Sequence, residues 1–142
     1  MIDWSGSTSI VTGGASGLGN AAARAFAALG MKVVIFDVND ALGEPEATDI
    51  GGHYYHVDVS DPASISQALD RVEADVGIPR AIVNCAGIAP AAKTVSRGLA
   101  HDAEVFAKAI NINLMGSFYC ASQVAARMVA ADTLDGLSLI HI

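Results

Sequence analysis

The chain has 142 residues, of which 52% are hydrophobic and 16% are charged, and its formal net charge is −7. This length suffices for one domain with a buried core, and the apolar composition is typical of elements buried on both faces, as in a parallel sheet covered by helices. The acidic balance argues against nucleic acid as a partner, because binding phosphates requires a basic surface.

Four apolar, strand-like runs alternate with helix-like segments along the chain. The strand candidates lie at 7–12, 32–37, 53–59 and 81–83. The helix candidates lie at 19–29, 39–50, 62–76 and 101–131. This alternation predicts an α/β fold: a Rossmann-like, doubly wound parallel sheet with right-handed crossovers and helices on both faces, which stops after about the fourth or fifth strand.

Several element ends carry start or stop signals. Gly30 follows the first helix candidate as a C-terminal stop. Gly43 and Pro45 predict that the second helix is short or broken, because proline removes a backbone donor inside a helix. Asp61 and Pro62 are typical of an N-cap followed by proline at the first helical position, and they predict where the third helix begins.

The most informative stretch is the glycine-rich turn Thr12-Gly13-Gly14-Ala15-Ser16-Gly17-Leu18-Gly19. It joins a strand candidate to a helix candidate, which is the context that a dinucleotide-binding turn requires. Gly13 permits the tight turn, Gly17 lets backbone approach a pyrophosphate, and Gly19 lets the helix pack closely on the sheet. The helix N-terminus then directs free N–H groups at the phosphates. A turn without a ligand is the weaker alternative, because three glycines cost backbone entropy.

Two aspartates follow the next strand candidates. Asp37 can accept hydrogen bonds from ribose hydroxyls and would repel a 2′-phosphate, and no arginine occupies 36–40, so NAD is favoured over NADP. The alternative is a solvated aspartate at a strand end. Asp58 could contact the adenine amino group, with the Val59 backbone beside it. An aspartate that caps the turn before Pro62 is nearly as good an interpretation.

The fourth strand candidate ends in Asn84-Cys85-Ala86-Gly87, whose small residues let backbone lie along a cofactor, and Asn84 can tie adjacent strand ends together. Cys85 has little support as a nucleophile, because no basic residue adjoins it to lower the thiol pKa. Asn113 is a polar amide among apolar neighbours and needs a partner, although it or Asn111 can also be an ordinary helix residue. The histidines and cysteines show no metal-ligand spacing, so no metal is expected.

Targeting signals are not visible in the sequence. No signal-peptide pattern is found at the N-terminus, and polar residues interrupt the helical stretch 105–131, so no membrane span is predicted. Cys85 and Cys120 are interpreted as free thiols in a reducing compartment rather than a disulfide, which leads us to expect a cytoplasmic protein. No Gly-x-Ser-x-Gly elbow supports a hydrolase.

Together these motifs resemble the short-chain dehydrogenase/reductase family, from about Ser5 to about Asp135. The family turn Thr-Gly-x-x-x-Gly-x-Gly is matched by Thr12, Gly13, Gly17 and Gly19. The signatures Asn-Asn-Ala-Gly and Asn-Leu-x-Gly are matched by Asn84-Cys85-Ala86-Gly87 and Asn113-Leu114-Met115-Gly116. With Ile88-Ala89, Lys93-Thr94 and Ser117-Phe118, these segments look like the branch of type 2 3-hydroxyacyl-CoA dehydrogenases and 17β-hydroxysteroid dehydrogenases.

The resemblance implies reversible hydride transfer between a secondary alcohol and NAD. It also implies a small-molecule substrate, such as a 3-hydroxyacyl-CoA, and a dimeric or tetrameric parent enzyme. The cofactor contacts that it carries over fall on Ser16, Leu18, Asp37, Asp58, Val59 and Cys85, the last through its backbone. Asn113 matches the family's asparagine, which organises a proton-relay water through a local break in its helix. It is the one catalytic position that the resemblance assigns to this chain.

The family's remaining chemistry lies in a serine after the fifth strand and in a Tyr-x-x-x-Lys pair, whose lysine lowers the tyrosine pKa. Four residues after Tyr54, Tyr55 and Tyr119 lie Asp58, Val59 and Gln123, so this chain does not contain the pair. Because family members are longer, we expect an N-terminal fragment that is inactive alone. A non-catalytic dinucleotide-binding module is the alternative, whereas a methyltransferase would not explain the later signatures.

The last residues, 137–142, can be encoded by a transposon adapter used to prepare sequencing libraries. We therefore expect a domain over 1–136 and a non-native tail over 137–142. The alternative is a genuine fifth strand, since the run is apolar and partly alternating. Without the second half, Phe106, Leu114 and Phe118 are expected to form an exposed apolar patch, and the chain alone to be poorly soluble.

Overall fold

The structure is a computed structural model that describes residues 3–131. The expected tail at 137–142, and with it the alternative of a fifth strand, lies outside the described residues. Within the described range, no helix is long and apolar enough to cross a membrane.

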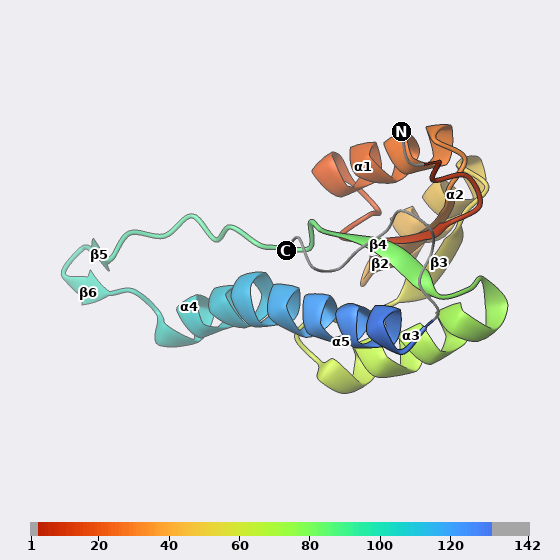
Figure 1. Ribbon diagram of the computed structural model, residues 1–142. Helices are drawn as coiled ribbons and strands as arrows, with labels where there is room; N and C mark the ends of the chain where they lie inside the picture. Colours follow the sequence, from red (N-terminus) through yellow and green to blue (C-terminus); the bar gives the residue numbers. More distant parts are fainter. Residues whose placement is uncertain (1–2, 132–142) are drawn as a thin grey trace.

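Four strands form one parallel sheet in the order β3-β2-β1-β4 (Figure 1). They are β1 (Thr8–Thr12), β2 (Lys32–Asp37), β3 (His53–His56) and β4 (Pro79–Asn84). Every pairing between them is parallel, and Val11 of β1 lies opposite Ile35 of β2 and Val83 of β4. The predicted α/β fold with a parallel sheet is confirmed.

Helices cover both faces of this sheet, with α1 (Gly17–Ala28) and α2 (Asp40–Asp49) on one side and α3 (Pro62–Asp75) and α5 (Ser117–Ala130) on the other. The core on the α1–α2 side contains Val11, Ala23, Val33, Ile35 and Ala47. The core on the α3–α5 side includes Ile10, Val34, Phe36, Leu69 and Val124. Successive residues of β1 and β2 therefore bury opposite faces, which explains why both runs are apolar throughout.

The predicted helix signals are confirmed at two ends. Gly30 follows α1 with φ = 77°, the left-handed conformation of a C-terminal stop. The Asp61 side chain accepts a hydrogen bond from the Ala63 N–H (2.9 Å), and Pro62 opens α3.

The expectation of a broken second helix is wrong. Helix α2 runs unbroken through Pro45, after the Asn39 side chain accepts a hydrogen bond from the Leu42 N–H (3.3 Å). Proline removes one backbone bond, but the helix is held against the sheet by buried Gly43 and Ala47. Tertiary packing therefore outweighs the local cost of the proline.

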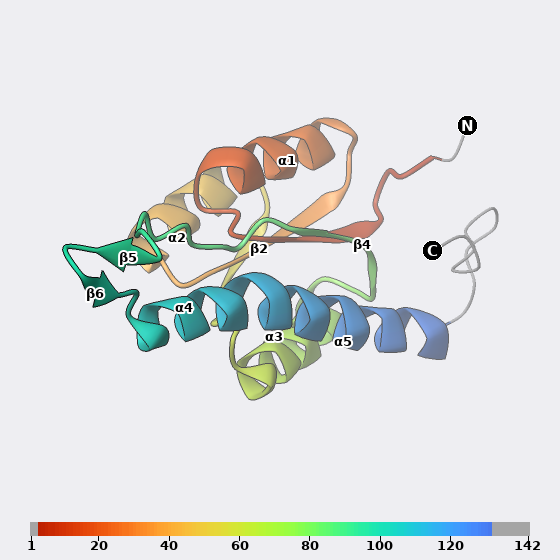
Figure 2. The same cartoon turned by 90° about the vertical axis from the view of Figure 1, so that its left-hand side faces the viewer.

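The predicted helical region 101–131 is present, but it consists of three segments: α4 (Ala103–Ile110), a π-helix η1 (Asn111–Gly116) and α5. Figure 2 shows that they follow one another as a single rod. The π-helical turn is wider than an α-helical turn and is frequently found at functional sites. The local break implied by the family resemblance therefore lies at Asn113.

A short antiparallel hairpin, β5 (Val95–Ser96) and β6 (Leu99–Ala100), was not predicted. Its turn residues Arg97 and Gly98 both have positive φ, 51° and 78°, as a type I′ turn requires. The strands are too short to give an alternating pattern. In Figures 1 and 2 the hairpin projects beyond the sheet at the start of α4.

Candidate functional site

The predicted site residues meet at the carboxyl edge of the sheet, because all four strands are parallel and end there. A cleft of about 150 Å³ opens at this edge. It is lined by Asp37, Val38, Val57, Asp58, Val59, Ala86, Gly87, Ile88 and Ile112. Sequence reasoning singled out five of these residues, and the apolar Val38, Val57, Ile88 and Ile112 are additions. The cleft has apolar walls and two carboxylates.

The three motif glycines have different surroundings. A Cβ on Gly13 (φ = 65°) would lie 2.7 Å from the backbone nitrogen of Ala86, and one on Gly19 would collide with the Gly13 carbonyl. A Cβ on Gly17 (φ = 56°) would meet nothing within 4 Å. Gly13 and Gly19 are therefore needed for packing within the protein, whereas Gly17 borders open space. Gly19 packs on the turn itself, where contact with the sheet was expected.

Thr12 ties the turn to the end of β4, a role that the sequence did not indicate. Its hydroxyl oxygen accepts hydrogen bonds from the backbone N–H groups of Cys85 and Ala86, both at 3.1 Å. The Asn84 side chain was expected to tie strand ends together. It instead donates to the Ser117 carbonyl in α5 (3.5 Å). Thr12 therefore joins the strand ends, and Asn84 joins β4 to the helix layer.

Asp37 lies at the centre of the edge. One carboxylate oxygen accepts a hydrogen bond from the Ala15 N–H in the glycine-rich turn (3.1 Å), and the other accepts from the Asn39 N–H (3.0 Å). The carboxylate therefore joins the turn after β1 to the turn after β2. Each oxygen keeps a further lone pair for another donor.

Asp58 caps its turn, as the alternative interpretation expected. Its Oδ1 accepts from the Ser60 N–H (2.9 Å) and the Ser60 hydroxyl (2.6 Å), while its own N–H donates to Ser64 Oγ (3.1 Å). Asp58 also lines the cleft, so the capping role and a ligand role do not compete for position. Val59 packs against η1, because a Cβ on Gly116 would lie 2.7 Å from its methyl group.

The Asn113 side chain holds the loop after β4. Its Oδ1 accepts from the Ile88 N–H and its Nδ2 donates to the Ile88 carbonyl, each at 2.8 Å. The backbone carbonyl of Asn113 accepts from Ser117 Oγ (2.7 Å). The partner that a polar amide requires is therefore Ile88, and the amide keeps one further N–H and one further lone pair.

The cysteines are free, Cys85 partly buried and Cys120 buried. Burial raises the pKa of the Cys120 thiol to about 12, so this group stays neutral and unreactive. Among residues 3–131, no cluster of three or more His, Cys, Asp or Glu side chains could hold a metal.

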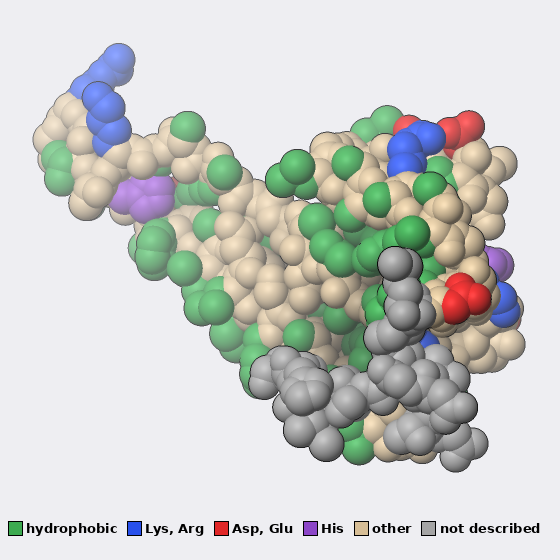
Figure 3. All heavy atoms as spheres, turned by 45° about the horizontal axis from the view of Figure 1, so that its top comes forward, with side chains coloured by type: hydrophobic (Ala, Val, Ile, Leu, Met, Phe, Trp, Pro, Cys, Tyr) green, Lys and Arg blue, Asp and Glu red, His purple; other side chains and the backbone are tan. Residues whose placement is uncertain are grey.

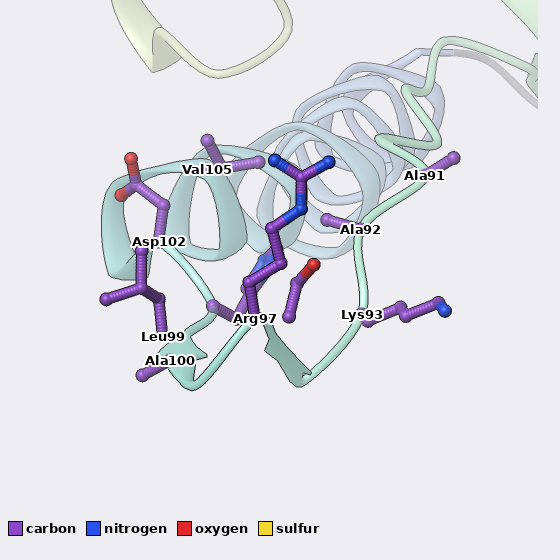
Figure 4. A pocket seen from close by; sticks show the side chains of 10 residues that line it. Ala91, Ala92, Lys93, Arg97, Leu99, Ala100, Asp102 and Val105 are labelled. Atoms are coloured by element: carbon purple, nitrogen blue, oxygen red, sulfur yellow. The ribbon is translucent and has the colours of Figure 1, made fainter.

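A second, open hollow of about 580 Å³ lies between the hairpin and α4, and its lining includes Lys93, Arg97, His101, Asp102 and Val105 (Figure 4). The Arg97 side chain lies across the hollow, whereas Lys93 points away from it. Figure 3 shows Lys and Arg side chains gathered at this projecting end. The hollow therefore has a cationic side at Arg97.

This geometry fits a dinucleotide. Open space at a positive-φ glycine, at the N-terminus of α1, suits a pyrophosphate, and a strand-end carboxylate with spare lone pairs suits ribose hydroxyls. Sheet, turn and cleft together define an α/β protein of the Rossmann-like class.

Comparisons with known proteins agree with this fold class. A family model described as "Enoyl-(Acyl carrier protein) reductase" matches residues 13–140. The type-2 3-hydroxyacyl-CoA dehydrogenase of Homo sapiens is 35% identical over 127 residues, which are 87% of this chain and 49% of that protein. The Drosophila melanogaster protein of that name is 40% identical over 114 residues, 78% of this chain and 45% of its own. Mitochondrial borneol dehydrogenase of Lavandula x intermedia is 33% identical over 125 residues, 87% of this chain and 47% of its own.

Among solved structures, one titled ribose-5-phosphate isomerase, from Brucella melitensis 16M, superposes with a TM-score of 0.81 at 28% identity. The match covers 90% of this chain and 48% of that one. The chain belongs to the short-chain dehydrogenase/reductase family, whose dehydrogenases generally depend on a nicotinamide dinucleotide. It spans about half the length of the curated relatives it matches.

Proposed function

We propose that this chain is the cofactor-binding N-terminal part of an NAD-dependent dehydrogenase, which transfers hydride between a secondary alcohol and NAD. The observation that carries the proposal is Asp37. Asp37 ends β2, and its carboxylate accepts a hydrogen bond from the glycine-rich turn. In this position it can accept hydrogen bonds from both ribose hydroxyls and would repel a 2′-phosphate.

The other predicted site residues are proposed to contact different parts of the cofactor. Backbone N–H groups around Ser16, Gly17 and Leu18 face the pyrophosphate, whose negative charge is stabilised at the start of α1. Asp58 and Val59 border the adenine end of the cleft. The loop Asn84-Cys85-Ala86-Gly87 offers backbone and small side chains to the rest of the cofactor. NAD, when bound, supplies the hydride acceptor.

Asn113 is the proposed catalytic residue of this chain. Its side chain holds Ile88, and we assign the proton-relay water to its backbone carbonyl, which lies in the π-helical turn and also accepts from Ser117 Oγ (2.7 Å). The tyrosine and lysine that the family uses for proton transfer are supplied by the part of the parent enzyme that follows this chain, so the chain alone has no dehydrogenase activity.

The substrate is proposed to be a 3-hydroxyacyl-CoA or a similar alcohol. The names of the relatives support this class, as does the cationic hollow at Arg97, which suits a phosphorylated substrate. We further propose that the parent enzyme is a cytoplasmic homo-oligomer, in line with two free cysteines and with exposed apolar side chains along the long helical rod.

The deciding experiment begins with the uninterrupted reading frame beyond Asp135. A Tyr-x-x-x-Lys motif in that frame, and NADH formation from a 3-hydroxyacyl-CoA by the protein it encodes, would support the enzyme. The matched control is the 142-residue chain, which should form no NADH. A reading frame without the motif, encoding a protein that binds NAD but shows no turnover, would favour the non-catalytic module instead.

A further inference from the structure

Four hydrogen bonds hold Asp37. Besides the two bonds to its carboxylate, its backbone carbonyl lies 3.0 Å from the Val57 nitrogen and 2.9 Å from the Tyr54 hydroxyl oxygen. The first donor belongs to the segment after β3 and the second to β3 itself. Strand β3 and the segment after it therefore fix the backbone of Asp37, the residue that is proposed to bind the ribose.

The Tyr54 hydroxyl also contacts the first residue of α2. Its oxygen lies 2.6 Å from Asp40 Oδ1, so its single proton is shared between this carboxylate and the Asp37 carbonyl. His56, two residues along the same strand, places Nδ1 2.7 Å from the same Asp40 oxygen. Tyr54, Asp40 and His56 thus form one network across the β2–α2 turn.

The Tyr54 ring is tightly packed against α2, and nearby carboxylates act on its pKa. A Cβ on Gly43 would collide with the Tyr54 ring, so the backbone of α2 lies directly on that ring. Burial raises the pKa of Tyr54, and the carboxylates of Asp40, Asp37 and Glu44 raise it further. Bonds from Tyr54 and His56 hold the pKa of Asp40 below its usual range, so this carboxylate is charged at neutral pH.

We propose that Tyr54 and Asp40 determine which dinucleotide this site accepts, Tyr54 by positioning Asp37 and Asp40 by adding a second negative charge beside it. This inference rests on the proposed NAD site. A bound 2′-phosphate would have to approach a turn that carries two carboxylates, those of Asp37 and Asp40. A strand-end aspartate alone would present only one. A ribose with a free 2′-hydroxyl would meet an Asp37 already held in one orientation, which lowers the entropy lost on binding.

Two substitutions separate these roles in the protein encoded by the uninterrupted reading frame. Asp40→Asn keeps an oxygen acceptor for Tyr54 but removes the charge. It should tighten NADPH binding roughly tenfold, the size expected for one partly screened charge, and leave NADH binding nearly unchanged. Tyr54→Phe keeps the ring on Gly43 but removes the hydroxyl. It should weaken NADH binding several-fold and raise KM for NAD, with kcat little altered.

The readouts are dissociation constants from NADH and NADPH fluorescence and an alkaline absorbance titration of the protein without cofactor. In Asp40→Asn the Tyr54 pKa should fall toward its ordinary value. Asp49→Asn is the matched control, because Asp49 is an exposed, ion-paired acid at the other end of α2. It should leave the NADH to NADPH preference unchanged, and thermal unfolding verifies that every variant is folded.

Unchanged preference in both Asp40→Asn and Tyr54→Phe, alongside lost preference in Asp37→Ala, would overturn this inference and leave the NAD site standing. An unmodified protein that binds neither dinucleotide would overturn the proposed function and this inference with it. Lost affinity for both dinucleotides in Asp40→Asn would also contradict the charge role.

Discussion

Asn113 of the π-helical turn and Ile88 of the loop after β4 form a pair of hydrogen bonds, each 2.8 Å, that use both ends of the asparagine amide and both backbone polar groups of Ile88. Ile88 lines the cleft, so the asparagine fixes one wall of the proposed cofactor site. The bonds also hold the long helical rod against the carboxyl edge of the sheet.

Replacing Asn113 by leucine should therefore lower the free energy of unfolding by about 2 kcal/mol, because two hydrogen bonds of about 1 kcal/mol each are lost. Urea denaturation measures this change. Asn111→Leu is the control, since Asn111 is exposed and lies in the same π-helical turn without such a pair. Equal losses in the two variants would show that the pair with Ile88 contributes nothing specific.

Gly17 gives a prediction that separates backbone strain from cofactor binding. Gly17→Ala should cost roughly 1 kcal/mol of stability, because φ is positive there, and should also abolish NADH binding by filling the open space at the turn. Gly51→Ala is the matched control: its φ is 67° and its surroundings are equally open, but it lies beyond α2, away from the cleft. It should lose the same stability and keep NADH affinity. Retained affinity in Gly17→Ala would contradict the proposed pyrophosphate position.

The sequence predicted the parts of the site that follow from strand order. Asp37, Asp58 and the Asn84–Gly87 loop each follow an apolar run, and parallel strands bring their carboxyl ends to one edge, so their convergence needs no knowledge of side-chain contacts. Their assignment to a cofactor remains a prediction.

The contacts that tune the site could not be predicted in this way. Thr12 binds backbone groups that lie 73 and 74 residues further along the chain, and Tyr54 reaches back 17 residues to Asp37. Such partners are set by tertiary packing, which leaves no periodic signal. The same reasoning applies to unbroken α2, where a local rule about Pro45 gave the wrong expectation.

Cys120 predicts a loss of stability at alkaline pH. Burial raises its pKa from 9.0 to about 12, so folding favours the neutral thiol. The resulting stabilisation is complete below pH 9.0 and is lost progressively as the pH rises toward about 12. Tyr54 and Tyr55 also have raised pKa values and act in the same direction, so the test compares the unmodified protein with Cys120→Ala. The variant should show a shallower decline in unfolding free energy over this range, and an identical slope would contradict the prediction.

The long helical rod carries the last prediction, which concerns self-association. Phe106, Leu114 and Phe118 are 58%, 61% and 64% exposed, as expected, and Figure 3 shows hydrophobic side chains along the surface that leads from the hairpin. Three large exposed side chains on one rod favour association, because burying them against a second surface removes apolar area from water.

The 142-residue chain should therefore form oligomers or aggregates whose size grows with concentration, as measured by light scattering and sedimentation velocity. Phe118→Lys should shift the population toward monomer by placing a charge in the patch. Leu29→Lys is the matched control, because Leu29 is 57% exposed at the end of α1, remote in the fold from the rod, and it should leave association unchanged. Monomer at all concentrations, or equal effects of the two lysines, would show that the patch does not drive association.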